Sequence, residues 1–258
     1  MLSACGIAVR LGRTRVLRGV DFDARPGALT AIVGPNGSGK TTLLRALVGD
    51  LAHDGTVLLD GTPLSRLDPW VLAARRAVLP QATPLAFPFT VHEVVGLGLA
   101  AGAHATEPGI AAAALAAVGL EGCGARFFQE LSGGQQARAH LARVLAQVWE
   151  PVAQDRARWL FLDEPVASLD IGHQLQVMRL ARDYAARGGG VVAVMHDLNL
   201  TAMFADAVTL IHEGRVLAAG PPADVLTDGT LSHAYGCPLR TNRPPAPGQV
   251  FVLPQAVA

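Results

Sequence analysis

The stretch Gly34-Pro35-Asn36-Gly37-Ser38-Gly39-Lys40-Thr41-Thr42 lies between an apolar, partly β-branched run, Ala28–Val33, and a segment whose leucines recur at helical spacing. A glycine-rich turn between a strand and a helix is the setting that a phosphate-binding loop requires. Its glycines let successive backbone N–H groups point into one concavity, and the helix N-terminus adds partial positive charge. Lys40 is then placed to reach the outer phosphates, and the Thr41 hydroxyl to hold magnesium. The full pattern favours binding of a nucleoside triphosphate over a glycine turn with a merely exposed lysine.

The composition of this chain limits the kinds of partner that we expect it to bind. Half of its 258 residues are hydrophobic, which is enough for a substantial core. Lys+Arg and Asp+Glu both total 21, so no global basic field favours a nucleic-acid partner, and none is expected. Three scattered cysteines, in no metal-ligand spacing, favour reduced thiols in a cytosolic protein. The N-terminus lacks the pattern of a secretory signal, and the longest alanine-rich region falls short of about 20 clean apolar residues. Any association with a membrane is therefore expected to go through a protein partner.

The order of apolar runs and turns predicts an α/β fold. Residues 4–33 alternate and turn like an antiparallel β unit, and later strands alternate with helices as in a mostly parallel sheet. A region rich in alanine and poor in strand signals interrupts this alternation and predicts an inserted helical subdomain. We expect a short helix over Ser65–Ala74 and a polar surface connection over Val152–Arg158. The predicted organisation is a single domain over 1–258, with its core in 1–81 and 131–220, the helical subdomain at about 82–130 and a C-terminal tail over 221–258.

Polar side chains follow four of the predicted strands. Gly34, Gln81, Asp163 and His196 each come directly after an apolar run. Because ligands of open α/β sheets bind at the carboxyl ends of the strands, we expect these four positions to face one crevice.

The residues at this crevice suit phosphoryl transfer, which needs charge neutralisation and a positioned nucleophile. Asp163 would bind magnesium directly or through water, and Glu164 would act as general base on the attacking water. The alternative is a pair of surface acids that ends a strand. Gln81 would contact magnesium or the water, unless it is only a turn residue. His196 would hydrogen-bond a phosphate or the water, unless local backbone satisfies its ring.

A second glycine-containing motif, Leu131-Ser132-Gly133-Gly134-Gln135-Gln136, opens another predicted helix. Ser132 and the two glycines would form an anion site, yet neither a lysine nor a magnesium ligand accompanies them. Such an incomplete site makes sense if it closes over phosphates that the loop of a second copy already holds. The motif therefore predicts a head-to-tail dimer with nucleotide between each phosphate loop and the opposite Ser132 segment. The alternative is a helix N-cap without a ligand.

With these residues in place, nearly the whole chain resembles an ATP-binding subunit of the ATP-binding-cassette (ABC) transporters. Gly34–Thr41 resembles the Walker A motif, Gln81 the Q-loop, Leu131–Gln135 the family signature, Leu160–Glu164 Walker B with its catalytic glutamate, Ser168-Leu169-Asp170 the D-loop, and His196 the switch histidine. The resemblance implies that Glu164, His196 and Gln81 are catalytic. It also implies that Thr41, Gln81 and Asp163 bind Mg²⁺, and that ATP is the nucleotide.

A narrower resemblance is to importers of iron chelates, cobalamin and haem. Phe87–Val91 and His196–Leu200 are similar to that group, and Trp149-Glu150-Pro151 is most like the haemin-importer ATPases. Leu11 stands where the family usually places an aromatic residue that stacks on adenine.

The resemblance implies an ATPase that powers haem uptake from the cytoplasmic face of the inner membrane, to which it binds peripherally. Its implied partners are a second copy, two integral membrane permease subunits and, indirectly, a periplasmic substrate-binding protein. Ferric siderophore or cobalamin is the alternative cargo. The alternatives of another class are a non-transport cassette ATPase acting on DNA or ribosomes, and a P-loop small-molecule kinase.

Overall fold

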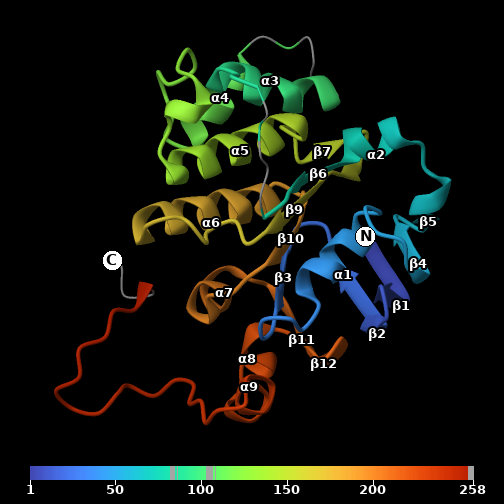
Figure 1. Ribbon diagram of the computed structural model, residues 1–258, viewed down its shortest axis with the longest axis vertical. Coiled ribbons are helices and arrows are strands. Elements are labelled where there is room, and N and C mark those ends of the chain that lie inside the picture. The colour runs from blue at the N-terminus through green and yellow to red at the C-terminus, as the bar shows by residue number, and fades with distance from the viewer. Residues whose placement is uncertain (82–84, 86, 103–106, 108, 255–258) are drawn as a thin grey trace.

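The structure is a computed structural model that describes residues 1–81, 85, 87–102, 107 and 109–254. A central sheet has the strand order β12-β11-β3-β10-β9-β6, in which all neighbours are parallel except the β11–β12 hairpin. Helices cover this sheet, as Figure 1 shows. The α/β fold predicted from the sequence is therefore confirmed. The strands are β3 (Leu29–Val33), β6 (Arg76–Leu79), β9 (Trp159–Asp163), β10 (Gly190–Val194), β11 (Ala207–His212) and β12 (Arg215–Gly220).

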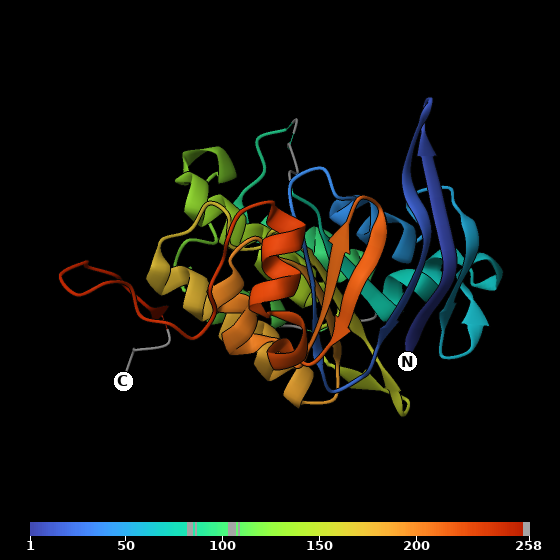
Figure 2. The ribbon, with the colours of Figure 1, turned by 90° about the horizontal axis from the view of Figure 1, so that it is seen from below.

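A second, antiparallel sheet has the strand order β2-β1-β4-β5 and stands beside the central one (Figure 2). Its strands are β1 (Leu2–Leu11), β2 (Thr14–Ala24), β4 (Asp54–Leu59) and β5 (Thr62–Pro63). The β4–β5 hairpin turns through Asp60 and Gly61, with φ of 50° and 77°. Two central residues with positive φ match the twist of the flanking strands, which is why glycine is favoured there.

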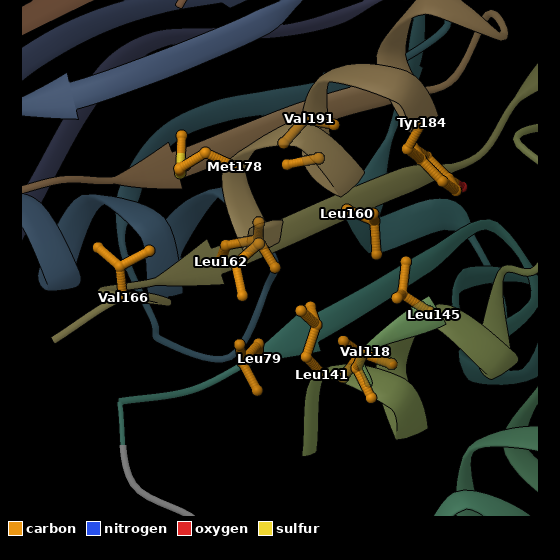
Figure 3. Close-up of a cluster of buried hydrophobic side chains, with 14 of the residues drawn as sticks. Leu79, Val118, Leu141, Leu145, Leu160, Leu162, Val166, Met178, Tyr184 and Val191 are labelled. Atoms are coloured by element: carbon orange, nitrogen blue, oxygen red, sulfur yellow. The ribbon is translucent and has the colours of Figure 1, made fainter. Parts of the chain in front are cut away.

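The central sheet is buried on both faces, so its strands are continuously apolar instead of alternating with polar residues. In β9, Leu160 and Leu162 face one apolar cluster, whereas Trp159 and Phe161 face another. The first cluster, drawn in Figure 3, joins the sheet to α5 (Gly133–Gln147) and α6 (Ile171–Ala186). The second cluster joins the sheet to α1 (Lys40–Leu47) and the antiparallel sheet. This packing fixes the ends of the central strands, where the polar residues lie.

The inserted helical region consists of α3 (Val91–Ala101) and α4 (Ile110–Ala117), which pack against α5. A capping box of Thr90 and Glu93 begins α3. Glycines allow an unusually close contact between α3 and α5. A Cβ atom on Gly98 would lie 1.9 Å from the Arg143 carbonyl oxygen, and one on Gly102 would lie 2.2 Å from that of Gln147. The two helices therefore meet backbone to backbone.

Two segments differ from the expectation from sequence. Val152–Arg158 contains a hairpin, β7 (Val152–Ala153) and β8 (Arg156–Ala157), which turns through two residues of positive φ. The expected helix over 65–74 is divided into a 3₁₀ turn, Leu64–Arg66, and α2 (Pro69–Arg75). Proline at the first helical position lacks the N–H that would continue a helix from the preceding turn, so a new helix begins there.

The C-terminal region adds α7 (Leu198–Phe204), α8 (Pro222–Val225) and α9 (Asp228–Tyr235), with α9 packed beside the β11–β12 hairpin (Figure 2). A second 3₁₀ turn, Phe128–Glu130, precedes α5. Over the residues described, each helix is too short or too polar to cross a lipid bilayer.

Candidate functional site

The phosphate loop predicted from sequence connects β3 to α1, which begins at Lys40. Gly34 has φ of 147°, and a Cβ atom there would lie 2.1 Å from the Ile211 carbonyl oxygen, so only glycine fits. The Lys40 ammonium donates hydrogen bonds to the carbonyl oxygens of Gly34, at 2.9 Å, and Pro35, at 3.0 Å. The lysine side chain therefore folds back over its own loop. Burial lowers the pKa of Lys40, while the negative charges of Glu164 and Asp163 oppose that shift.

An open cavity of about 730 Å³ lies above the loop. It brings together residues from the loop, from the ends of two other strands, and from the segment that follows β6. Its lining consists of Val16, Asn36, Gly37, Gly39, Lys40, Thr41, Thr42, Gln81, Glu164 and His196. Of the four positions expected to face one crevice, Gln81 and His196 line this cavity. Gly34 and Asp163 are not part of the lining, although residues that closely follow them in sequence are.

One buried hydroxyl in the loop lacks a partner. Ser38 is 5% exposed, and its Oγ atom neither donates nor accepts a hydrogen bond within the described part of the chain. A buried polar atom of this kind is costly unless a ligand or water satisfies it. A hydroxyl donor beside a lysine and at the start of a helix matches the needs of a phosphate group, so the loop fits a nucleotide.

Asp163 ends β9 and faces the loop. It accepts a hydrogen bond of 3.1 Å from the Thr41 hydroxyl. Burial raises its pKa, the Thr41 hydrogen bond lowers it, and nearby Glu164 raises it further. A hydroxyl, a carboxylate and an amide oxygen, such as that of Gln81 in the cavity lining, are hard oxygen ligands that Mg²⁺ prefers, usually together with phosphate and water. A bound cation would favour the ionised form of this buried carboxyl, so the donor set fits Mg²⁺.

Glu164 adopts a left-handed backbone conformation, with φ of 52°. Non-glycine residues seldom adopt it, and such outliers often occur at functional sites. Its side chain is held from two sides: Gln81 Nε2 donates to one carboxylate oxygen at 3.0 Å, and His196 Nε2 lies 2.6 Å from the other. The three residues whose catalytic role the resemblance implies therefore form one connected group at the cavity.

The Ser132 segment lies outside this group. Ser132 caps α5 through a reciprocal pair of hydrogen bonds: its hydroxyl accepts from the Gln135 N–H at 3.3 Å, and the Gln135 side chain accepts from the Ser132 N–H at 3.0 Å. Ser132 and Gly133 are exposed, and Gly134 packs beside Ser168 and Leu169. Of the four residues from Ser132 to Gln135, none lines the cavity above the loop.

The sequence reasoning missed Val16, which lines the cavity from β2. It considered Leu11 instead, but that side chain is 47% exposed at the end of β1 and is not part of the lining. A signal for Val16 is hard to find in sequence because its position depends on a contact with Gly39, where a Cβ atom would lie 3.5 Å from Val16 Cγ1.

Known proteins place this geometry in a family. The family model for ABC transporters matches residues 17–167. The hemin import ATP-binding protein HmuV of Jannaschia sp. (strain CCS1) is 61% identical over 254 residues, which are 98% of this chain and 94% of that protein. The protein of the same name from Roseobacter denitrificans is 61% identical over 255 residues, 99% of this chain and 98% of its own.

Solved structures share the fold at lower identity. The ATP-binding subunit of an ABC transporter superposes with a TM-score of 0.76 at 21% identity, covering 92% of this chain and 94% of its own. A cassette solved as a post-hydrolysis dimer with ADP and Pi has a TM-score of 0.74 at 24% identity, covering 86% and 99%. The sequence matches and the shared fold lead to one conclusion: the chain belongs to the ABC transporter family.

Proposed function

We propose that this protein is the ATP-hydrolysing subunit of an ABC importer and powers the uptake of haem. The position of Glu164, at the cavity above the phosphate loop and in contact with both Gln81 and His196, carries the proposal of hydrolysis. The cargo is supported by relatives named hemin import ATP-binding protein, which are 52–61% identical over nearly the full chain. Ferric siderophore or cobalamin is the alternative cargo.

Each residue of the site has a role in the proposed reaction. Gly34–Thr42 would surround the phosphates with backbone N–H groups, and the Lys40 ammonium would leave the carbonyl oxygens of Gly34 and Pro35 to bind the outer phosphates. Thr41, Gln81 and Asp163 would hold Mg²⁺, which neutralises phosphate charge when bound. The Glu164 carboxylate would take a proton from water as the water oxygen attacks the terminal phosphorus, and the bond from that phosphorus to its bridging oxygen breaks.

His196 and Gln81 would hold Glu164 and the attacking water in place. Proton transfer by a general base requires contact within hydrogen-bond distance, directly or through one water molecule. Two side chains that already bind the two carboxylate oxygens limit the orientations that this base can adopt. His196 can shift from the carboxylate to the terminal phosphate when nucleotide is present.

We further propose that Ser132, Gly133, Gly134 and Gln135 complete the nucleotide site of a second copy. Support comes from their exposure at the start of α5, apart from the cavity of their own chain. The helix N-terminus would supply N–H donors and partial positive charge to phosphates that the partner's loop holds. ATP would thus hold two copies together head to tail, and hydrolysis would release them.

Membrane partners would bind near the helical subdomain, which we place at about 82–130. Apolar side chains there are exposed to solvent: Phe87 is 67% exposed, Phe127 46% and Leu97 44%. Nearby exposed aromatic residues of this kind favour a protein interface. We propose two integral membrane permease subunits as the partners, with a periplasmic substrate-binding protein acting through them. The chain would then lie peripherally at the cytoplasmic face of the inner membrane.

Uptake by a deletion strain tests the proposed cargo. Cells that lack this gene should fail to grow with haem as the iron source. The wild-type gene should restore this growth, and the Glu164→Gln variant should not. Uptake of a ferric siderophore and of cobalamin should be unchanged in the same cells. Loss of siderophore or cobalamin uptake, with normal haem uptake, would overturn the proposal that haem is the cargo. Normal uptake of all three compounds would contradict the proposal that the protein powers import.

The partners that copurify with this protein distinguish an import ATPase from a non-transport cassette ATPase. A transport ATPase should purify from membranes together with a polytopic membrane protein, and Phe87→Asp should release it without loss of ATP binding. Copurification with DNA or ribosomes instead would support a non-transport cassette ATPase.

A further inference from the structure

The turn of the β11–β12 hairpin lies between the phosphate loop and strand β2. Gly214 in this turn is buried, and its N–H donates to the Ser38 carbonyl oxygen at 3.1 Å. Its own carbonyl oxygen accepts from the Arg18 N–H at 2.9 Å. One residue, about 175 positions from the loop in sequence, thus joins the loop to β2 through its two backbone groups.

The backbone of the turn at Gly214 lies so close to the backbone of β2 that no side chain fits between them. A Cβ atom on Gly214 would lie 2.0 Å from the Val16 carbonyl oxygen, 3.0 Å from the Val16 carbonyl carbon and 3.3 Å from Leu17 Cα. The Val16 side chain in turn lies beside Gly39 of the loop and lines the cavity. Loop, turn and strand therefore form a closed circuit of contacts around one side of the site.

The hairpin is also supported from behind. Helix α9 packs on β12, and the rings of His212 and His233 meet edge to face with centroids 5.3 Å apart. Figure 2 shows the hairpin between α9 and the antiparallel sheet. Because α9 occupies the space behind it, the hairpin resists moving away from β2.

We propose that Gly214 is a positioning residue for ATP: it sets the separation between the phosphate loop and the cavity wall that Val16 forms on β2. This inference rests on the proposed binding of ATP at the cavity. Gly214 does not line the cavity and would act only through Ser38 and Val16. Its lack of a side chain, more than its positive φ, is what the site requires.

A methyl group at Gly214 would change that separation. Cβ atoms essentially never come within 3.0 Å of such a neighbour, so alanine would force β2 and the turn at least 1 Å apart. A misplacement of about 1 Å in a binding site can cost on the order of 100-fold in activity. We expect the effect on nucleotide binding because the displaced wall would contact the bound nucleotide, whereas Glu164 lies at the end of a different strand.

The chain contains a matched control for backbone strain. The β4–β5 turn, Asp60-Gly61, has φ of 50° and 77°, and the β11–β12 turn, Glu213-Gly214, has φ of 47° and 73°. Alanine at Gly61 or Gly214 therefore meets the same unfavourable left-handed conformation. Around Gly61, however, the described chain leaves open space, with nothing within 4 Å of a Cβ atom.

The test compares full-length Gly214→Ala with Gly61→Ala and wild type in steady-state ATP hydrolysis with Mg²⁺. We expect Gly214→Ala to raise KM for ATP about 10- to 100-fold with kcat within about threefold of wild type. Gly61→Ala should lose only the thermal stability that the shared backbone conformation costs, with an unchanged KM. Equal KM values in the two variants would overturn the inference, as would a loss of stability alone. Lack of hydrolysis by the wild type would instead count against the proposed function.

A second pair of variants covers the case in which Gly214→Ala does not fold. One extra glycine inserted between Glu213 and Gly214 lengthens the turn and withdraws the N–H donor from Ser38 without adding a side chain. We expect a KM for ATP raised severalfold, and no change when the glycine is inserted between Asp60 and Gly61. Equal KM values for these two insertions would also overturn the inference.

Discussion

His196 Nε2 lies 2.6 Å from Glu164 Oε1, so the side chain at the end of one strand holds the proposed base at the end of its neighbour. Strands β9 and β10 pair in parallel, which brings their carboxyl ends together. The other oxygen of Glu164 accepts a hydrogen bond from Gln81. Side chains from two other segments therefore orient this carboxylate.

Removing the charge of Glu164 should separate binding from chemistry. We expect Glu164→Gln to bind ATP with near-wild-type affinity, because glutamine keeps the shape of the side chain. Hydrolysis should fall about 100- to 10,000-fold, since a carboxamide cannot act as general base. ATP should then hold the variant as a dimer, which size-exclusion chromatography with and without ATP would detect. Glu130→Gln, outside the cavity, should behave as wild type; undiminished hydrolysis by Glu164→Gln would remove Glu164 from the role of base.

Loss of the Lys40 ammonium should weaken nucleotide binding. Charge-assisted hydrogen bonds contribute about 1.5–3 kcal/mol, so Lys40→Ala should raise Kd for ATP about 10- to 100-fold. Titration with a fluorescent ATP analogue measures this change. Arg45→Ala removes an exposed positive charge from the other end of α1 and should leave Kd unchanged. An unaltered Kd in Lys40→Ala would contradict the assignment of the phosphate loop.

Mixing two inactive variants should restore hydrolysis if each site is shared between copies. A Lys40→Ala chain lacks a working loop, and a Ser132→Arg chain lacks a working α5 start. Their heterodimer would nevertheless contain one intact site, made of the loop of the second chain and the Ser132 segment of the first. We expect ATPase activity to reappear on mixing, measured after subunit exchange.

The control for this experiment is a chain that carries both substitutions, mixed with wild type. In that heterodimer each of the two sites contains one defect, so hydrolysis should reflect only the remaining wild-type homodimers. Hydrolysis in the control above the level of the remaining wild-type homodimers, or no recovery in the mixture of single variants, would contradict a site shared between the two copies.

Asp163→Asn should stabilise the nucleotide-free protein while abolishing its activity. Burial raises the pKa of Asp163 above 3.8, so the folded state holds this proton more tightly than the unfolded state does. The resulting stability is present below pH 3.8 and is lost as pH rises through the folded-state pKa. The variant should therefore have the higher Tm at neutral pH, and the difference should shrink toward pH 4. Thermal unfolding without nucleotide or Mg²⁺ checks this.

Asp228 offers a control of opposite sign. Hydrogen bonds from the Thr241 N–H, Arg240 and the Thr241 hydroxyl lower its pKa to about 2. Its contribution to stability is present above 3.8 and is lost as pH falls toward 2, so Asp228→Asn should lower Tm at neutral pH. A higher Tm in this variant, or a lower one in Asp163→Asn, would contradict the linkage.

Local sequence was sufficient to predict the phosphate loop and the strand ends. Gly34–Thr42 carries its own conformational signals, and Asp163 and His196 follow runs that are apolar on both faces of the sheet. The hairpin within 152–158 gave no such signal, because strands of two residues are too short to show periodicity. Its turn residues, Gln154 and Asp155, adopt positive φ without the glycine that usually marks such a turn.

Contacts between distant segments were beyond sequence reasoning. Val16 and Gly214 are separated by nearly 200 positions, and each looks ordinary in its own strand or turn. Only the folded arrangement shows that one backbone leaves no space for a Cβ atom on the other. Which residues are buried at a site depends on which helices and strands pack together, and local patterns in a single sequence do not reveal that packing.

Helix α3 meets α5 through Gly98 and Gly102, with no side chain between the two backbones. Because the two backbones are in contact, α3 and α5 would move together as one rigid unit. Any displacement of α3 by a permease would therefore also displace α5. Ser132 caps the N-terminus of α5, so in the proposed dimer this displacement would move Ser132 toward or away from the ATP site of the second copy.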